Sequence, residues 1–204
     1  YNKKTNDLAK TYIALGEGNL PAIIGLCEVE SKEVMQSLCY DSPLRKGGYD
    51  YIHYDSRDIR GIDVALIYRK EKFELIEEKN IDVAKDLGFD YPTRDVLYVY
   101  GKLNQYPLHI FVIHAPSRRH KDRNKGMRKR IFEYIYKLSH ELYLEKGEDI
   151  IVMGDMNDNP WNKSVKYGFQ IRNNQKHNPL FHNLMLKNKG KAGSYVYGRD
   201  VLCF

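Results

Sequence analysis

The sequence has 204 residues, of which 42% are hydrophobic and 29% are charged. This composition is typical of a folded globular domain and excludes an intrinsically disordered chain. No apolar run approaches the ~18 residues that cross a bilayer, so no transmembrane segment is predicted. The three cysteines, Cys27, Cys39 and Cys203, show neither a disulfide framework nor a zinc-site spacing, and we interpret them as small buried side chains.

The net charge of +6 suits an anionic partner but does not identify one. Basic residues concentrate between positions 117 and 130, where Asp122 is the only acid. These residues are Arg118, Arg119, Lys121, Arg123, Lys125, Arg128, Lys129 and Arg130. Such a segment could follow a phosphate backbone, or it could be the solvated start of a helix.

The chain begins with a predicted helix, because Leu8, Tyr12 and Leu15 fall on one face at helical spacing. Gly16 and Gly18 are predicted to end this helix.

Strands and helices follow in groups. Ser31 is predicted to cap a second helix that runs through Leu38. Strand-like apolar runs occur at residues 22–26, 49–54, 62–68, 73–83, 96–103, 108–114 and 149–153. A long helix carries the stripe Ile131, Ile135, Leu138 and Leu142, a short helix follows Pro160, and residues 195–204 resemble a last strand pair. Consecutive strands with helices before and after favour two packed sheets with helices outside, in a single domain over residues 1–204.

Polar side chains follow two of these strands, where loops are held by a rigid scaffold. Glu28 comes soon after strand 22–26, a position that suits a ligand of a hard cation such as Mg²⁺. His114 ends strand 108–114 and could donate a hydrogen bond to a phosphoryl oxygen, with Arg118 and Arg119 contacting the same anion. The alternatives are a surface glutamate, a core histidine and a solvated basic face.

A third group follows strand 149–153, where Gly154 frees the backbone to turn. If the chain stays extended there, Asp155 and Asn157 face the same site. The carboxylate could then orient or deprotonate water and the amide could fix a phosphate oxygen, although a Gly-Asp turn is also common in loops.

A fourth group precedes strand 62–68. Arg60 could reach a substrate anion from its loop. Asp63 could orient a neighbouring group, but pairing with an arginine is the favoured interpretation.

Taken together, four stretches resemble the endonuclease/exonuclease/phosphatase family, which includes DNase I-like and exonuclease III-like phosphoesterases. They are GLCEVE (25–30), RGIDVALIY (60–68), VIHAPSRR (112–119) and VMGDMNDNP (152–160). The resemblance covers roughly residues 12–204. It implies an α/β (α+β) fold, a four-layer αββα sandwich of two mainly antiparallel β-sheets packed face to face with helices outside.

The resemblance also implies roles. Glu28 would be a ligand of Mg²⁺, which Mn²⁺ could replace, and His114 would contact the scissile phosphate. Asp155 would orient or activate the attacking water, and Asn157 would hold that water or the phosphate. Three arginines would lie at the substrate: Arg60, Arg118 and Arg119.

The sequence departs from the family pattern in three places. Cys27 stands where the family commonly has glutamine, an early strand with an asparagine is missing, and no Asp is followed by His. We therefore expect a fragment that lacks the first strand and the terminal Asp-His strand, with the Asp-His pair just beyond Phe204.

The expected function is Mg²⁺-dependent hydrolysis of phosphate esters, with phosphodiester bonds of nucleic acid as the first candidate. Inositol phosphates and sphingomyelin-type lipids are alternative substrates. A non-catalytic domain that binds phosphate or nucleic acid through a degraded site is a further alternative. We expect a monomer with no protein partner, and the sequence favours no compartment.

Overall fold

The computed structural model describes residues 2–16, 19–118, 122–171, 181–185, 195–197 and 200–202. The chain divides into two units. Unit 1 consists of Tyr1–His114 and Glu148–Gly154, and unit 2 consists of Ala115–Gly147 and Asp155–Phe204.

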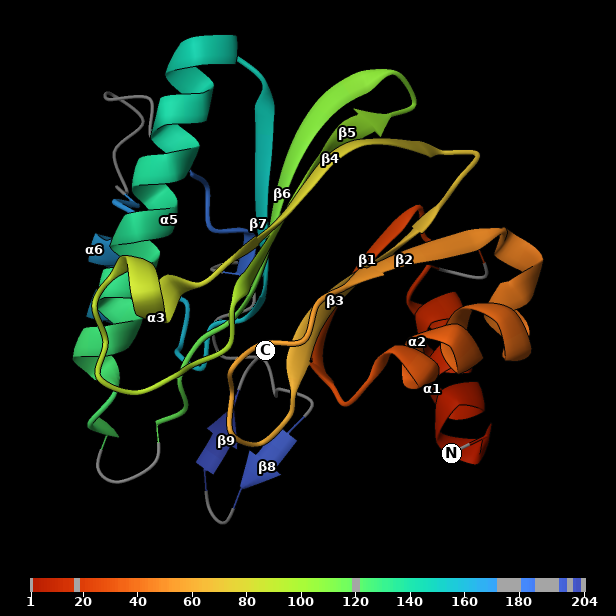
Figure 1. Ribbon diagram of the computed structural model, residues 1–204, viewed down its shortest axis with the longest axis horizontal. Helices are drawn as coiled ribbons and strands as arrows, with labels where there is room; N and C mark the ends of the chain where they lie inside the picture. Colours follow the sequence, from red (N-terminus) through yellow and green to blue (C-terminus); the bar gives the residue numbers. More distant parts are fainter. Residues whose placement is uncertain are drawn as a thin grey trace. The chain divides into compact units, whose positions relative to one another are not determined.

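Unit 1 contains a three-stranded antiparallel sheet with the strand order β1-β3-β2. Its strands are β1 (Ile23–Val29), β2 (Tyr49–His53) and β3 (Asp63–Arg69). The helical elements α1 (Asn2–Leu15), α2 (Lys32–Gln36), η1 (Ser37–Asp41) and η2 (Pro43–Gly47) lie beside this sheet in Figure 1. Ala9, Met35 and Leu44 from these helices are fully buried in one cluster with Leu26 and Ile67 of the sheet, so the helices cover one of its faces.

The second sheet has the order β4-β5-β6-β7. Its strands are β4 (Phe73–Ile81), β5 (Val96–Leu103), β6 (Tyr106–His114) and β7 (Asp149–Asp155), and the short helix α3 (Val83–Asp86) follows β4. β5 and β6 form a hairpin whose turn residues Asn104 and Gln105 both have positive φ, as a two-residue turn matched to the strand twist requires. Leu66 of the first sheet is buried in one cluster with Val99 and Ile110 of the second, so within unit 1 the two sheets pack face to face.

Unit 2 contains α5 (Lys125–Lys146), α6 (Lys163–Gly168) and the strand pair β8 (Tyr195–Tyr197) and β9 (Asp200–Leu202). The ring of Phe132 on α5 stacks on Phe169 at a centroid distance of 4.8 Å. A Cβ on Gly168 would lie 2.5 Å from the Cβ of Phe132, so the glycine permits the close approach of α6 to α5.

The helix predicted from Ser31 through Leu38 is interrupted in the structure. α2 ends at Gln36, a π-helical turn follows, and Ser31 makes no capping hydrogen bond through its side chain. Pro43 excludes the helical conformation at Ser42, whose ψ is 175°. Ser42 begins η2 instead, since its hydroxyl oxygen accepts a hydrogen bond from the Leu44 N–H. α1 ends at Leu15, next to Gly16 as predicted, while Gly18, Cys203 and Phe204 lie outside the described residues.

Candidate active site

Glu28 lies near the end of β1, where a β-bulge interrupts the pairing with β3. Cys27 is opposite Val64 and Val29 is opposite Asp63, so Glu28 is the extra residue. Its φ of 61° is in the left-handed region, which costs a non-glycine residue about 1–3 kcal/mol. The side chain is exposed, and its carboxylate makes no hydrogen bond or ion pair with another residue in the described part of the chain. The bulge therefore presents a carboxylate whose oxygens are available to a ligand.

Asp63, the first residue of β3, is buried beside His53. The N–H of Ser56 donates to Asp63 Oδ1 at 2.9 Å, and Asp63 Oδ2 lies 3.3 Å from His53 Nε2. The partner of Asp63 is thus a histidine, where the sequence favoured an arginine.

His114, the last residue of β6, is only 4% exposed. Burial lowers its pKa to about 4, the charge of Arg60 adds to this lowering, and Asp58 partly offsets it. The imidazole is therefore uncharged near neutral pH, and the structure places Arg60 close enough to act on it.

Arg60 lies in the loop between β2 and β3, where Asp58 sets its position. The backbone N–H of Arg60 donates to Asp58 Oδ1 at 2.9 Å, and its Nε lies 3.4 Å from the same oxygen. Asp58 Oδ2 lies 3.4 Å from Nε of Arg94, a residue that is only 4% exposed. The sequence indicated Arg60 but missed Arg94.

Thr93, Arg94 and Asp95 are all buried directly before β5. Burial raises the pKa of Asp95 to about 6, a hydrogen bond from Asn80 at 2.6 Å lowers it, and the charges of Asp82 and Asp63 raise it. The sequence does carry a sign of this group, because three polar residues stand directly before an apolar strand. Polar residues at the starts of strands are therefore as informative as those at their ends.

In unit 2, Asp155 and Asn157 are joined by a tight turn. The Asn157 N–H donates to Asp155 Oδ1 at 2.7 Å, and Asn157 has a φ of 47°. The Asn157 Nδ2 donates to the carbonyl of Ala115 at 2.9 Å. The chain does not stay extended here, because the Asp155 carboxylate closes a local turn, and this turn holds the two residues together instead.

A fully buried arginine, Arg128 of α5, holds the loops of unit 2 together. Its Nε lies 3.2 Å from Asp158, its NH1 group donates to the carbonyl of Pro116 at 3.2 Å, and its NH2 group donates to Asp122 at 2.6 Å. The sequence placed Arg128 in a basic segment that could follow a phosphate backbone or be solvated, but Arg128 is buried and its neighbours Arg123 and Lys125 are exposed. Arg118 is also exposed, and Arg119 lies outside the described residues.

The model of the Endonuclease/Exonuclease/phosphatase family matches residues 1–204. The chain belongs to this family. The endonuclease/exonuclease/phosphatase family consists of metal-dependent phosphoesterases, and its members typically depend on Mg²⁺. Among curated proteins, no sequence matches this chain.

Several solved structures share the fold at low sequence identity. An endonuclease/exonuclease/phosphatase family protein from Bacteroides thetaiotaomicron has a TM-score of 0.62 and 17% identity, over 82% of this chain and 58% of its own. D. rerio TDP2 in complex with a single strand DNA product has a TM-score of 0.56 and 16% identity, over 80% of this chain and 57% of its own. The human Nocturnin catalytic domain with a bound sulfate anion has a TM-score of 0.57 and 17% identity, over 80% of this chain and 61% of its own. These likenesses confirm the predicted α/β fold class with two sheets and helices.

The chain spans about three fifths or less of the length of these solved structures. None of the helices in the described part of the chain has both the length and the hydropathy that crossing a bilayer requires.

The surroundings of Glu28 fit the Mg²⁺ ion that the endonuclease/exonuclease/phosphatase family implies. Mg²⁺ keeps several of its waters and is commonly bound through one or two carboxylates. Glu28 offers an exposed carboxylate without a described partner, at a backbone position that the bulge fixes.

Proposed function

We propose that this chain is a Mg²⁺-dependent phosphoesterase domain that hydrolyses phosphodiester bonds of nucleic acid. The observation that carries the proposal is His114, a buried imidazole whose pKa is lowered to about 4 mainly by burial, with the charge of Arg60 adding to the lowering. A neutral imidazole still has one ring N–H that can donate a hydrogen bond, and the nearby guanidinium favours an anion. A phosphoryl group matches both features.

Glu28, His114 and Arg60 would bind and polarise the substrate. Glu28 would hold the Mg²⁺ ion, which supplies charge neutralisation at the phosphoryl oxygens. His114 donates a hydrogen bond to a phosphoryl oxygen as negative charge develops there, and Arg60 contacts the same anion. Asp58 limits the freedom of Arg60, which lowers the entropic cost of that contact.

Asp155 and Asn157 would act on water. Asp155 orients the attacking water and accepts its proton, while Asn157 contacts that water or the phosphate through its amide. The turn that joins these two residues fixes the carboxylate, because the Asn157 N–H restrains one of its oxygens. The hydrogen bond from Asn157 to Ala115 restrains the amide in the same way.

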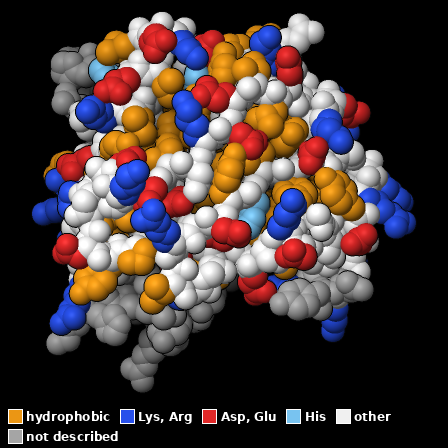
Figure 2. Space-filling view, in the orientation of Figure 1, with side chains coloured by type: hydrophobic (Ala, Val, Ile, Leu, Met, Phe, Trp, Pro, Cys, Tyr) orange, Lys and Arg blue, Asp and Glu red, His pale blue; other side chains and the backbone are white. Residues whose placement is uncertain are grey.

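Nucleic acid is the proposed substrate class for two reasons. D. rerio TDP2, which shares the fold, was solved with a single strand DNA product. Exposed basic residues also gather before and at the start of α5, namely Arg118, Arg123, Lys125, Lys129 and Arg130. On the face in Figure 2, acidic and basic side chains are interspersed, so this face is not a broad cationic surface.

The test is hydrolysis of single-stranded DNA, duplex DNA, RNA, inositol phosphates and sphingomyelin with and without Mg²⁺. It uses the 204-residue chain and any longer protein that contains it. We expect Mg²⁺-dependent cleavage of nucleic acid that Glu28→Gln and His114→Gln reduce by about 10²–10³-fold. The matched control Glu30→Gln, the same change two residues away on an exposed side chain, should leave turnover unchanged.

Three outcomes would count against the proposal. Near wild-type turnover in Glu28→Gln and His114→Gln would refute their assignment. Cleavage confined to inositol phosphates or sphingomyelin would replace nucleic acid as the substrate. Binding of nucleic acid without cleavage, in the longest protein that contains the chain, would indicate a non-catalytic binding domain.

A further inference from the structure

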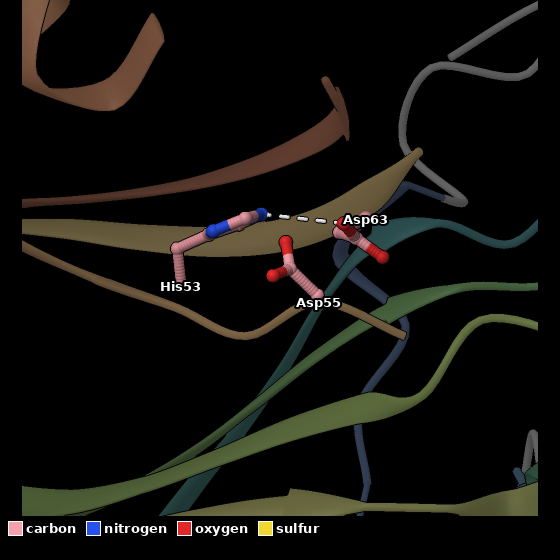
Figure 3. A group of neighbouring side chains, drawn as sticks. All are labelled: His53, Asp55 and Asp63. Carbon is pink, nitrogen blue, oxygen red and sulfur yellow. Dashed lines mark ion pairs between the residues drawn. The ribbon is translucent and has the colours of Figure 1, made fainter. Parts of the chain in front are cut away.

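A second group of metal-ligand side chains lies in unit 1 and does not include Glu28. His53 ends β2, Asp55 follows it in the loop, and Asp63 begins β3. Each offers one ligand atom, and these atoms all lie within 4.8 Å of one another. Figure 3 shows the three side chains converging from β2, the loop and β3.

The polar atoms of this cluster are incompletely used by the protein. Asp63 Oδ1 accepts the Ser56 N–H, which leaves Oδ2 facing His53. The His53 side chain is 97% buried, and its Nε2 lies 3.3 Å from Asp63 Oδ2 but has no partner in hydrogen-bond geometry among the described residues. The Asp55 carboxylate, which is exposed, also has no described partner. A buried ring nitrogen that faces carboxylate oxygens without a hydrogen bond costs free energy of folding, unless a bound ion or water contacts both groups.

We propose that His53, Asp55 and Asp63 bind one divalent transition-metal ion, with Zn²⁺ and Mn²⁺ as the candidates. Two ligands of one such ion lie at most about 4.4 Å apart, twice the usual bond length, so the observed spread requires shifts of less than about 1 Å. The imidazole nitrogen favours these ions over Mg²⁺ and Ca²⁺, which take oxygen ligands. Because Asp55 is exposed, the ion has a route from solvent and positions for water.

The proposed site is separate from Glu28 and does not depend on the proposed phosphoesterase activity. The Glu28 carboxylate is not one of the three ligands, although its bulge lies next to Asp63 on the neighbouring strand. A bound ion would tie the end of β2 to the start of β3 and so restrain the connecting loop, which carries Arg60. Metal binding should therefore stabilise the fold as well as fill the site.

Titration calorimetry of the metal-free 204-residue chain with Zn²⁺, Mn²⁺ and Mg²⁺, one at a time, tests the proposal without any assay of activity. Co²⁺ absorption reports the ligand set independently. Asp55→Asn is the principal variant, because this exposed residue can change without disturbing the core. His53→Gln is the second variant. Asp41→Asn, the same change at another exposed aspartate, and Glu28→Gln are the controls.

We expect one Zn²⁺ or Mn²⁺ ion per chain, bound more tightly than Mg²⁺, with a rise in melting temperature. Asp55→Asn and His53→Gln should each weaken Zn²⁺ binding by more than about 10-fold, while both controls bind Zn²⁺ as wild type does. Absence of Zn²⁺ and Mn²⁺ binding would show that His53 and Asp63 form only a buried structural pair, which overturns the proposal. Equal affinity in Asp55→Asn, or loss of binding in Glu28→Gln alone, would also overturn it, because the ion would then sit elsewhere.

Discussion

Arg128 and Asp158 form an ion pair in which both side chains are buried, with exposed fractions of 0% and 1%. Burial alone would raise the pKa of Asp158, but hydrogen bonds from Ser164 and Asn162, together with Arg128, hold it below its usual value. The pair joins α5 to the loop that follows β7, the loop in which Asn157 lies. The position of Asn157 therefore depends on a residue that has no place in the proposed chemistry.

Replacement of Arg128 by methionine should lower the free energy of unfolding by about 3–5 kcal/mol, because Asp158 is left charged and buried without its cation. Urea denaturation followed by circular dichroism measures this change. Arg123→Met, which removes an exposed arginine just before the same helix, should change stability by no more than about 0.5 kcal/mol. Equal stability of the two variants would contradict a structural role for the buried pair.

Gly154 lies where both the backbone conformation and the space available exclude a side chain. Its φ is 123°, and an added Cβ would lie 2.0 Å from the carbonyl oxygen of Ile113. Gly154→Ala should therefore destabilise the protein by more than about 2 kcal/mol, since backbone rather than a flexible side chain must move. The control Gly147→Ala has a φ of 66° and nothing within 4 Å, so it should cost only about 1 kcal/mol. Thermal melts of both variants compare the two effects, and a smaller loss for Gly154→Ala would contradict the close approach.

Much of this fold follows from hydrophobic patterning. The apolar runs at β3, β5 and β6 placed these strands correctly, because each strand is buried along most of its length. The limits of the second helix were predicted less well, because Ser31 makes no capping hydrogen bond through its side chain and α2 gives way to a π-helical turn at Ser37.

The candidate site was predictable only in part. Glu28 and His114 stand out in the sequence because polar residues end apolar runs. Nothing in the sequence shows that Glu28 has a positive φ or that Arg128 is buried, because both depend on pairing and packing across long sequence separations.

The strain at Glu28 predicts a conflict between stability and ligand binding. Glu28→Gly removes the penalty of a positive φ and should raise the free energy of unfolding by up to about 1 kcal/mol. The same substitution removes the carboxylate, so stabilisation of the fold by added Mg²⁺ should be lost. Glu28→Gln keeps the strain and should lose only the Mg²⁺ effect. A Glu28→Gly variant less stable than Glu28→Gln without metal would show that the bulge is not strained.

Asp95 should destabilise the protein when it is ionised. Because burial raises its pKa to about 6, the folded state binds a proton between pH 6 and the usual aspartate pKa near 4, where the unfolded state does not. The folded state therefore loses stability as the pH rises from about 4 to 6, and above pH 6 the full cost of ionising Asp95 is present. Asp95→Asn keeps an oxygen that can accept the hydrogen bond from Asn80, and it should be more stable than wild type by roughly 1–3 kcal/mol at pH 7.5. This gain should vanish near pH 4, and a variant less stable than wild type at pH 7.5 would contradict the prediction.

His114 should have the opposite pH dependence over nearly the same range. Its pKa is about 4 in the folded state, mainly because of burial, against about 6.5 for an unfolded chain. Between these values only the unfolded state binds the proton, so stability present above pH 6.5 is lost as the pH falls and the loss is complete below pH 4. Denaturation of wild type and His114→Gln from pH 8 to 4 isolates this effect, because Asp95 titrates in both proteins. The stability difference between the two should shift by roughly 2–3 kcal/mol towards the variant on acidification. Parallel curves would mean that His114 accepts a proton in the folded state as readily as in the unfolded state, and the neutral donor proposed for the phosphoryl group would then be lost.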